Sequence, residues 1–205
     1  HEGDADVIAI ADYGMGNLRS VEKALERIGK EAEITRDHAR IRAAEAIVLP
    51  GVGAFPKAME EIRRLELDRV LRERAEAGVP ILGICLGMQL LFEGSEELGG
   101  AEGLGLLRGR VERLDSRGLK LPQIGWNAVS WRDGHALHAG LPDPCAFYHV
   151  HTFAPRPADP EVVAGTATYG SEFVSAVASG NIAGVQFHPE KSGPAGLRLL
   201  ANFAP

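Results

Sequence analysis

The chain has 205 residues, of which 45% are hydrophobic and 24% charged, so we expect one compact domain over residues 1–205 with a substantial core. The formal net charge of -6 at pH 7, without a cluster of lysines and arginines, argues against a nucleic-acid partner. Two cysteines, neither in a C-x-x-C motif, exclude a disulfide scaffold and favour a reducing, cytoplasmic compartment.

The first element in the chain is an apolar run, Val7–Ala11, that predicts a buried strand. The polar residues 1–6 before it lack the charged-then-apolar pattern of an export signal. The loop DYGMGNLRS, Asp12–Ser20, follows the strand and contains the start of a dinucleotide-binding fingerprint. Arg19 stands where the third glycine belongs, so the fingerprint is incomplete and the loop needs another explanation.

The first half of the chain alternates β-type runs with amphipathic helical stretches. A helix is expected over Leu18–Ile28, strands in EAEIT and AIVLPG with a short connection between them, and one long helix over Pro56–Ala77. Pro56 lies near the first turn of that helix and Gly78 directly after its end. This alternation predicts an α/β fold with a mostly parallel sheet.

The second half contains shorter strand candidates separated by Gly, Pro and Asp. They are GLLRGRVERL, NAVSW, CAFYHVHTF, VVAGTAT, FVSAVASG and IAGVQFH, and a closing helix is expected over Ala195–Phe203. We interpret the strands as antiparallel ribbons added to the sheet. The predicted fold is therefore a single-domain open mixed sheet, with a mostly parallel core flanked by helices and antiparallel ribbons in its second half.

A cysteine between two glycines is the most informative feature. The apolar window Gly78–Phe92 has 15 residues and is too short and too often broken for a membrane span. Within it a strand-like run meets a helix-like run at Gly83-x-Cys85-x-Gly87, the thiol form of a nucleophile elbow. Such glycines let the chain turn sharply, and the following helix favours a thiolate. This favours a nucleophile over a buried structural cysteine, whereas Cys145, in an apolar strand candidate, keeps the structural interpretation.

A thiolate nucleophile needs a proton carrier and a group that orients it, and GVQFHPEKS offers both. His188 and Glu190 are two residues apart, so they share one face of an extended segment. Pro189 favours that extended conformation at His188. A histidine before a proline is more often structural when alone, but its combination with the elbow cysteine favours a catalytic role.

The third component is a site for an oxyanion. The strand AIVLP ends in PGVGAF, where glycines let backbone N–H groups face inward. The amides of Val52 and Gly53, with that of Leu86 after the nucleophile, are predicted to form the oxyanion hole. The competing interpretation is an ordinary glycine-capped turn between a strand and a helix.

The other histidines have simpler interpretations. His149 and His151 form an H-x-H pair without a third ligand nearby, so we expect strand histidines and no metal site. His135 and His138 lie in a loop flanked by Gly and Asp and are expected to be solvated.

Together, Cys85, His188, Glu190, PGVGAF and GICLGMQLLF resemble the class I (triad) glutamine amidotransferases. The resemblance covers most of the chain and implies a flavodoxin-like fold, glutamine as substrate, no cofactor, and ammonia released through a cysteinyl thioester. It implies that Cys85 is the nucleophile, His188 the general base and acid, and Glu190 its orienting partner.

The resemblance also implies a set of substrate residues. Gln89 and Glu97 match positions that hold the polar head of glutamine. Thr152 and Phe153 match the strand that lines the glutamine pocket, where family members often have Ser and Tyr. Phe153 has no hydroxyl, so contacts with the substrate are expected there through the backbone.

Further motifs narrow the resemblance to one branch of the family. DYGMGNLRSV, PGVGAF, PQIGWN, FYHVHTF and GVQFHPEKS together look like the glutaminase subunits of imidazole glycerol phosphate synthase, which serve histidine biosynthesis. This implies a heterodimer with a (β/α)8-barrel cyclase. The alternatives are a triad glutaminase of another pathway, a stand-alone thiol hydrolase and an inactive binding module.

The opening loop now has a candidate role. Because it follows the first strand, it is expected at the same sheet edge as the Cys85 elbow. We expect Tyr13, Asn17 and Arg19 to face the cyclase. The alternative is a helix cap with Asn17 as the capping residue.

Overall fold

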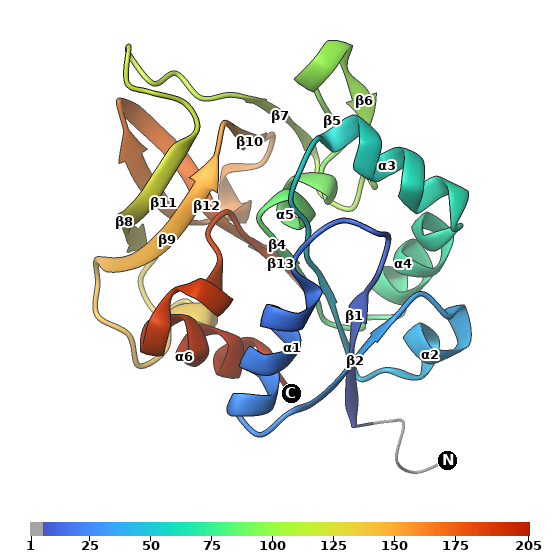
Figure 1. The fold of residues 1–205 in the computed structure, drawn as a ribbon. Coiled ribbons are helices and arrows are strands. Elements are labelled where there is room, and N and C mark those ends of the chain that lie inside the picture. Colours follow the sequence, from blue (N-terminus) through green and yellow to red (C-terminus); the bar gives the residue numbers. More distant parts are fainter. Residues whose placement is uncertain (1–5) are drawn as a thin grey trace.

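Within residues 6–205, nine strands form one mixed sheet in the order β2-β1-β3-β4-β13-β12-β11-β8-β9 (Figure 1). The computed structural model describes residues 6–205, so the expectation of no export signal in residues 1–6 falls almost entirely outside the described residues. The parallel strands are β1 (Val7–Ala11), β2 (Glu31–Thr35), β3 (Ala46–Leu49), β4 (Ile81–Ile84) and β13 (Ile182–Val185). Their order, 2-1-3-4 followed by β13, is that of the flavodoxin-like fold that the resemblance implies.

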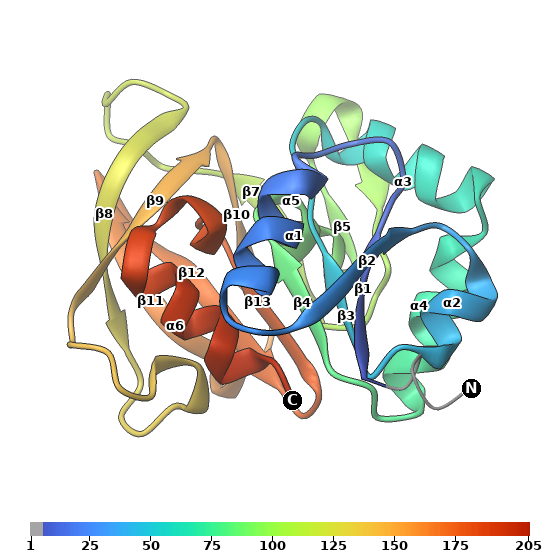
Figure 2. The same ribbon diagram turned by 60° about the horizontal axis from the view of Figure 1, so that its bottom comes forward.

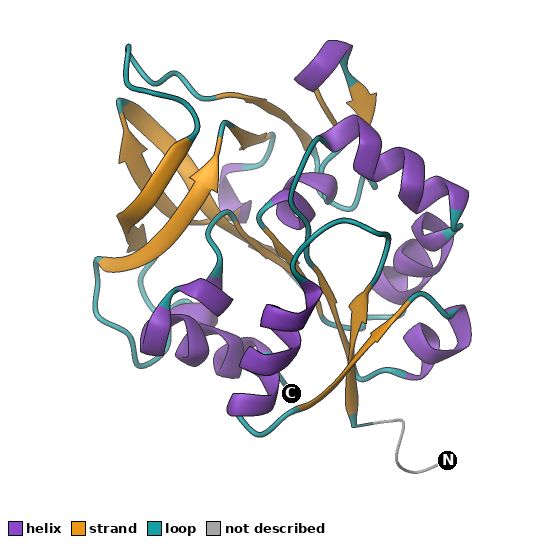
Figure 3. Cartoon of the chain, in the orientation of Figure 1, coloured by secondary structure: helices purple, strands orange, loops and turns teal. Residues whose placement is uncertain are grey.

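Antiparallel strands extend this sheet on one side. They are β12 (Ser171–Ser179), β11 (Val163–Tyr169), β8 (Gln123–Trp131) and β9 (Cys145–His151). Most of the helices surround the parallel part (Figure 3). The predicted mixed sheet, with a parallel core and antiparallel ribbons in the second half, is confirmed.

Helices cover both faces of the parallel sheet. They are α1 (Leu18–Arg27), α2 (His38–Ala43), α3 (Phe55–Arg64), α4 (Leu67–Glu76), α5 (Leu86–Leu90) and α6 (Gly193–Phe203). Short 3-10 helices are η1 (Glu97–Gly99), η2 (Ala136–His138), η3 (Pro160–Val162) and η4 (Pro189–Lys191). Figure 2 shows α1 and α6 side by side on one face. Alternate residues of β1 explain this arrangement, because Ile8 and Ile10 pack with α1 and α6 while Ala9 and Ala11 pack with α2 to α5.

Two predictions for the first half are wrong. The helix expected over Pro56–Ala77 is two helices, since Glu66 between α3 and α4 has a left-handed φ of 54°. Glu66 is neither Gly nor Pro, so the break carries no local signal. The expected connection before β3 contains α2, which Asp37 caps by accepting hydrogen bonds from the N–H groups of Ala39 and Arg40.

Two predictions for the second half also need correction. The segment IAGVQFH contains β13, which pairs antiparallel with β12 on one side and parallel with β4 on the other, so it completes the parallel core. GLLRGRVERL supplies β7 to a separate small sheet in the order β10-β7-β5-β6. Its strands are β10 (Phe153–Pro157), β7 (Gly109–Arg113), β5 (Gly94–Ser95) and β6 (Ala101–Glu102). Within residues 6–205, none of the helices has the length and apolar character needed to cross a membrane.

Candidate active site

A pocket of about 240 Å³ lies at the carboxyl edge of the parallel strands. The loops after β3, β4 and β13 meet there because parallel strands end at the same edge. The pocket is lined by Val52, Gly53, Cys85, Leu86, Gln89, Glu97, Pro122, Val150, His151, Thr152, Phe153, His188 and Lys191. It therefore brings together the predicted nucleophile, histidine, oxyanion amides and substrate residues.

The elbow between β4 and α5 places Cys85 in this pocket. Cys85 itself has the unusual backbone conformation, with φ 55° and ψ -115°. A Cβ atom on Gly87 would lie 1.7 Å from the carbonyl oxygen of Leu49, and one on Gly83 would lie 2.6 Å from that of Gly87. The two glycines are thus needed because β3, β4 and α5 approach closely, and the strained residue is the cysteine rather than its neighbours.

In the described part of the chain, three polar groups surround the Cys85 sulfur. Its thiol donates a hydrogen bond to the carbonyl oxygen of Val150, with 3.6 Å between Sγ and oxygen. The side-chain Nε2 of Gln186 donates to the sulfur at 3.9 Å. The third neighbour is His188, which shares a side-chain hydrogen bond with Cys85.

His188 and Glu190 form a buried pair. Nδ1 of His188 lies 2.7 Å from Oε1 of Glu190, and their side chains are 5% and 3% exposed. Burial lowers the pKa of His188, but the hydrogen bonds and negative charges of Cys85 and Glu190 outweigh it and raise the pKa to about 10. The imidazolium is therefore favoured at neutral pH, and a positive charge beside the sulfur stabilises a thiolate.

The PGVG loop is held from below by Tyr13. The Tyr13 hydroxyl donates a 2.6 Å hydrogen bond to the carbonyl oxygen of Pro50. Gly51 makes room for it, since a Cβ there would lie 2.0 Å from the hydroxyl oxygen. Beyond this anchor Val52 is 44% exposed and Gly53 has a φ of 110°, so the loop turns at the pocket wall.

The prediction that Tyr13 faces a partner is wrong. Its side chain is fully buried, and this burial, with the nearby charge of Cys85, raises the pKa of Tyr13. Asn17 is exposed and caps α1 by accepting a hydrogen bond from the N–H of Ser20, as the alternative interpretation required. Arg19 is exposed and lies 3.7 Å from Glu22. Both remain candidates for a partner contact.

The predicted substrate residues surround the pocket. Nε2 of Gln89 donates to the carbonyl oxygen of Phe153 at 3.1 Å and to Oε1 of Gln186 at 3.2 Å. Oε2 of Glu97 accepts a hydrogen bond from the N–H of Phe55 at 3.1 Å. Thr152 lines the same wall, partly exposed. Their roles toward glutamine stay predictions.

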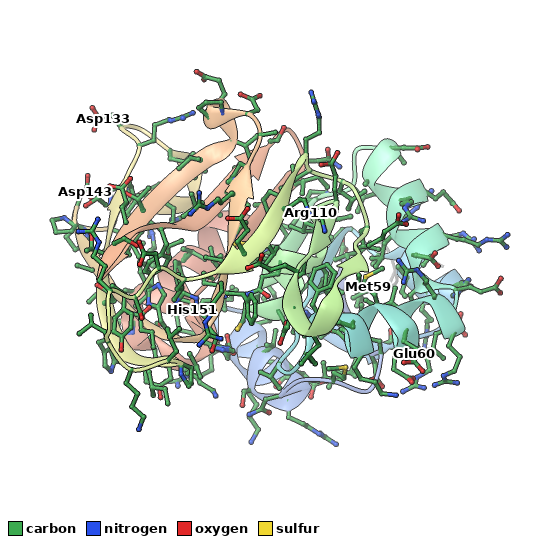
Figure 4. All side chains as sticks on the ribbon, turned by 90° about the horizontal axis from the view of Figure 1, so that it is seen from above. Met59, Glu60, Arg110, Asp133, Asp143 and His151 are labelled. Carbon is green, nitrogen blue, oxygen red and sulfur yellow. The ribbon has the colours of Figure 1, made fainter. Side chains whose placement is uncertain are left out.

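His149 and His151 are buried strand histidines, as predicted. Nε2 of His149 lies 2.8 Å from Oγ of Ser175, and Nε2 of His151 lies 2.7 Å from Oε1 of Gln123. Burial lowers the pKa of His149 to about 4 and that of His151 to about 3. Figure 4 labels His151 among the densely packed side chains of the interior, whereas Asp133 lies at the rim.

The prediction for Cys145 is confirmed, whereas those for His135 and His138 are corrected. Cys145 is buried in β9, and burial, with the charge of Asp143, raises the pKa of its thiol. His135 and His138 are not solvated but half-buried. Their rings lie against Trp131, with centroids at 6.2 and 5.5 Å.

Sequence reasoning missed Gln186 and the anchoring role of Tyr13. Gln186 stands two residues before His188, so the alternation of an extended segment places both on one side. That signal was available. The contact between Tyr13 and Pro50 joins loops that are distant in sequence, and no local sequence pattern predicts it.

Comparisons with known proteins show the family to which the chain belongs. The family description "Glutamine amidotransferase class-I" matches residues 9–204. A protein of Moorella thermoacetica named imidazole glycerol phosphate synthase subunit HisH is 53% identical over 96% of this chain and 93% of its own length. A protein of the same name from Rhodopirellula baltica is 52% identical over 97% of both chains.

Solved structures share the fold. One described as a glutamine amidotransferase superposes with a TM-score of 0.74 at 22% identity over 96% of both chains. The structure of PurLQS from Thermotoga maritima superposes with a TM-score of 0.76 at 21% identity over 97% of both chains. At these identities the likeness concerns the fold alone.

Proposed function

The chain belongs to the class-I glutamine amidotransferase family, within its branch of HisH subunits, and we propose that it is the glutaminase of an imidazole glycerol phosphate synthase. It hydrolyses glutamine to glutamate and ammonia. A (β/α)8-barrel cyclase in a heterodimer then uses the ammonia to form imidazole glycerol phosphate and aminoimidazole carboxamide ribonucleotide. The observation that carries the proposal is that Cys85 and His188 line one pocket while Glu190 holds His188 from behind, with 2.7 Å between its Oε1 and Nδ1 of His188.

Acylation begins with Cys85 as a thiolate and His188 as an imidazolium. The Cys85 thiolate attacks the side-chain carboxamide carbon of glutamine and forms a tetrahedral oxyanion. The amides of Val52, Gly53 and Leu86 are the proposed donors to this oxygen. His188, protonated and oriented by Glu190, gives its proton to the departing nitrogen, so ammonia leaves and a glutamyl thioester remains.

Deacylation returns the enzyme to its starting state. His188 accepts a proton from water as the water oxygen attacks the thioester carbon. The carbon–sulfur bond breaks, and glutamic acid is released while Cys85 and His188 regain their charged forms. The same histidine thus acts first as an acid and then as a base.

Hydrogen-bond acceptors in the pocket wall bind the amino-acid head of glutamine. The two N–H groups of the Gln89 amide are used within the protein, which leaves its Oε1 for the substrate ammonium. Glu97 uses Oε2 for the N–H of Phe55 and keeps Oε1. Thr152 and Phe153 contribute the adjacent strand, and recognition there depends on backbone groups because Phe153 has no hydroxyl.

A partner is needed because ammonia that escapes into water is protonated and loses its nucleophilicity. The exposed large apolar side chains among residues 6–205 are Val52, Leu98, Leu119, Ile124 and Trp126. Val52 lines the pocket, and Ile124 pairs across the strands with Val150, which also lines it. Paired residues share a face of the sheet, so Ile124 and Trp126 extend an apolar surface from the pocket. We assign the cyclase to this surface.

Asn17 and Arg19 remain proposed contacts with the cyclase, because their loop follows β1 at the same edge of the sheet as the pocket. We also propose that residues 1–205 act as one domain, since the nine-stranded sheet takes strands from both halves of the chain. Two free cysteines fit a cytoplasmic location.

The test is ammonia production from glutamine, measured with and without the cyclase and its nucleotide ligand. We expect activity that rises when the liganded cyclase is present, is abolished in Cys85→Ala and is retained in Cys145→Ser. A glutaminase rate that is unchanged by the cyclase but raised by another synthase would support the alternative of a glutaminase from another pathway. Hydrolysis of other amides without any partner would support a thiol hydrolase.

A further inference from the structure

Gln186 is a buried side chain between the nucleophile and the substrate wall. It follows β13, is fully buried, and its backbone N–H donates a 2.8 Å hydrogen bond to the carbonyl oxygen of Ser175 in β12. Its position is therefore fixed by the central sheet rather than by a loop. The mechanism above does not use it.

The side-chain amide of Gln186 has contacts at both ends. Its Nε2 lies 3.9 Å from the Cys85 sulfur, and its Oε1 accepts a 3.2 Å hydrogen bond from Nε2 of Gln89. Gln89 in turn donates to the carbonyl oxygen of Phe153. A chain of hydrogen bonds thus runs from the pocket wall through two amides to the nucleophile.

One backbone oxygen sets the direction of this chain. A carbonyl oxygen only accepts, so the amide of Gln89 must present its nitrogen to Phe153. The same nitrogen faces Gln186, which must therefore present its oxygen and turn its nitrogen toward Cys85. Reversing either amide would place two acceptors or two donors against each other.

We propose that Gln186 is a positioning residue that holds the Gln89 amide with its oxygen toward the substrate ammonium and offers an N–H to the Cys85 thiolate. This rests on the proposed glutaminase function. The second role follows from the change of charge at sulfur. The thiol donates to the carbonyl oxygen of Val150, but a thiolate has no hydrogen to donate, and the N–H of Gln186 then becomes its favourable neighbour.

Two substitutions separate the two roles. Gln186→Glu keeps an acceptor for Gln89 but places a carboxylate beside the sulfur. We expect the pH midpoint of Cys85 alkylation to rise by about one unit or more, and kcat to fall about 10-fold or more, with KM for glutamine changed less than about 3-fold. Gln186→Met removes both polar ends at similar length, so we expect kcat to fall and KM to rise by about 10-fold.

The experiment uses the chain bound to its cyclase. It records glutamine saturation curves, the rate of alkylation by iodoacetamide against pH, and the melting temperature. Gln123→Met is the matched control, because Gln123 is also a buried glutamine but contacts His151 rather than the sulfur. We expect it to lower the melting temperature while leaving the alkylation profile at its wild-type midpoint.

The outcomes distinguish the inference from the function on which it rests. If both Gln186 variants melt at lower temperature but keep the wild-type alkylation midpoint and KM, Gln186 is only structural and the proposal is overturned. If the wild-type complex hydrolyses no glutamine, the proposed function fails. Alkylation of Cys85 needs no glutamine, so a shifted midpoint in Gln186→Glu would still support the contact with the thiolate.

Discussion

The hydrogen bond from Tyr13 to Pro50 offers a sharp test of how the oxyanion loop is held. Tyr13→Phe removes one oxygen atom and keeps the ring in its buried site. The carbonyl oxygen of Pro50 then loses a donor at 2.6 Å in a part of the protein that water does not reach. Gly51, Val52 and Gly53 follow directly, so a shift of Pro50 moves the proposed oxyanion amides.

The expected magnitudes follow from the loss of a buried partner. A buried carbonyl left without its donor costs about 1–3 kcal/mol of unfolding free energy. For a chain of this size, each kcal/mol lowers the melting temperature by about 2–4 °C, so we expect a decrease of about 2–12 °C. Displacement of positioned catalytic groups lowers kcat by about 10- to 100-fold, and KM for glutamine should change less.

The assay is thermal unfolding together with glutamine saturation of the cyclase complex. Tyr169→Phe is the matched control, since the Tyr169 hydroxyl donates to the carbonyl oxygen of Lys120 at an exposed position. We expect this control to keep kcat. If Tyr13→Phe melts at a lower temperature yet retains full kcat, the oxyanion loop does not depend on the Tyr13 hydroxyl for its position.

Three further predictions follow from the elbow and the histidines. Gly87→Ala places a Cβ atom 1.7 Å from a backbone oxygen of β3, so it should destabilise the chain by about 3 kcal/mol or more, and a wild-type urea midpoint would argue against this packing. The pKa values of His149 and His151, about 4 and about 3, lie below the ordinary 6.5. Below about pH 6.5 the unfolded chain therefore binds more protons than the folded chain, so the free energy of unfolding should fall as the pH decreases. Equal free energies of unfolding from urea titrations at about pH 7 and about pH 5 would contradict this prediction. Glu190→Gln removes a negative partner and should lower the pKa of His188 from about 10, and an NMR titration of the ring that stays unchanged would show that Glu190 does not hold the proton there.

The sequence could predict the features that depend on local pattern. Continuous apolar runs and alternating helices identified the parallel core, because strands buried on both faces are apolar throughout. The glycines around Cys85 and the spacing of His188 and Glu190 identified the nucleophile and its partners. Parallel strands place all their following loops at one edge, so the elbow and the PGVG loop were expected together.

The parts that could not be predicted depend on contacts between distant segments. Tyr13 lies in a polar, glycine-rich loop, yet its ring is buried because Gly51 leaves space for it. Glu66 ends a helix without Gly or Pro, and His138 stacks on Trp131 although its loop is polar. These features depend on residues that are neighbours in space, and the periodicity of the local sequence does not specify them.

The proposed intermediate is a glutamyl thioester on Cys85, and peptide mass spectrometry of the cyclase complex, quenched in acid during turnover of glutamine, detects it directly. We expect the adduct on the peptide that contains Cys85, and none on the peptide that contains Cys145. Ammonia production with an adduct on Cys145, or undiminished production by Cys85→Ala, would contradict it.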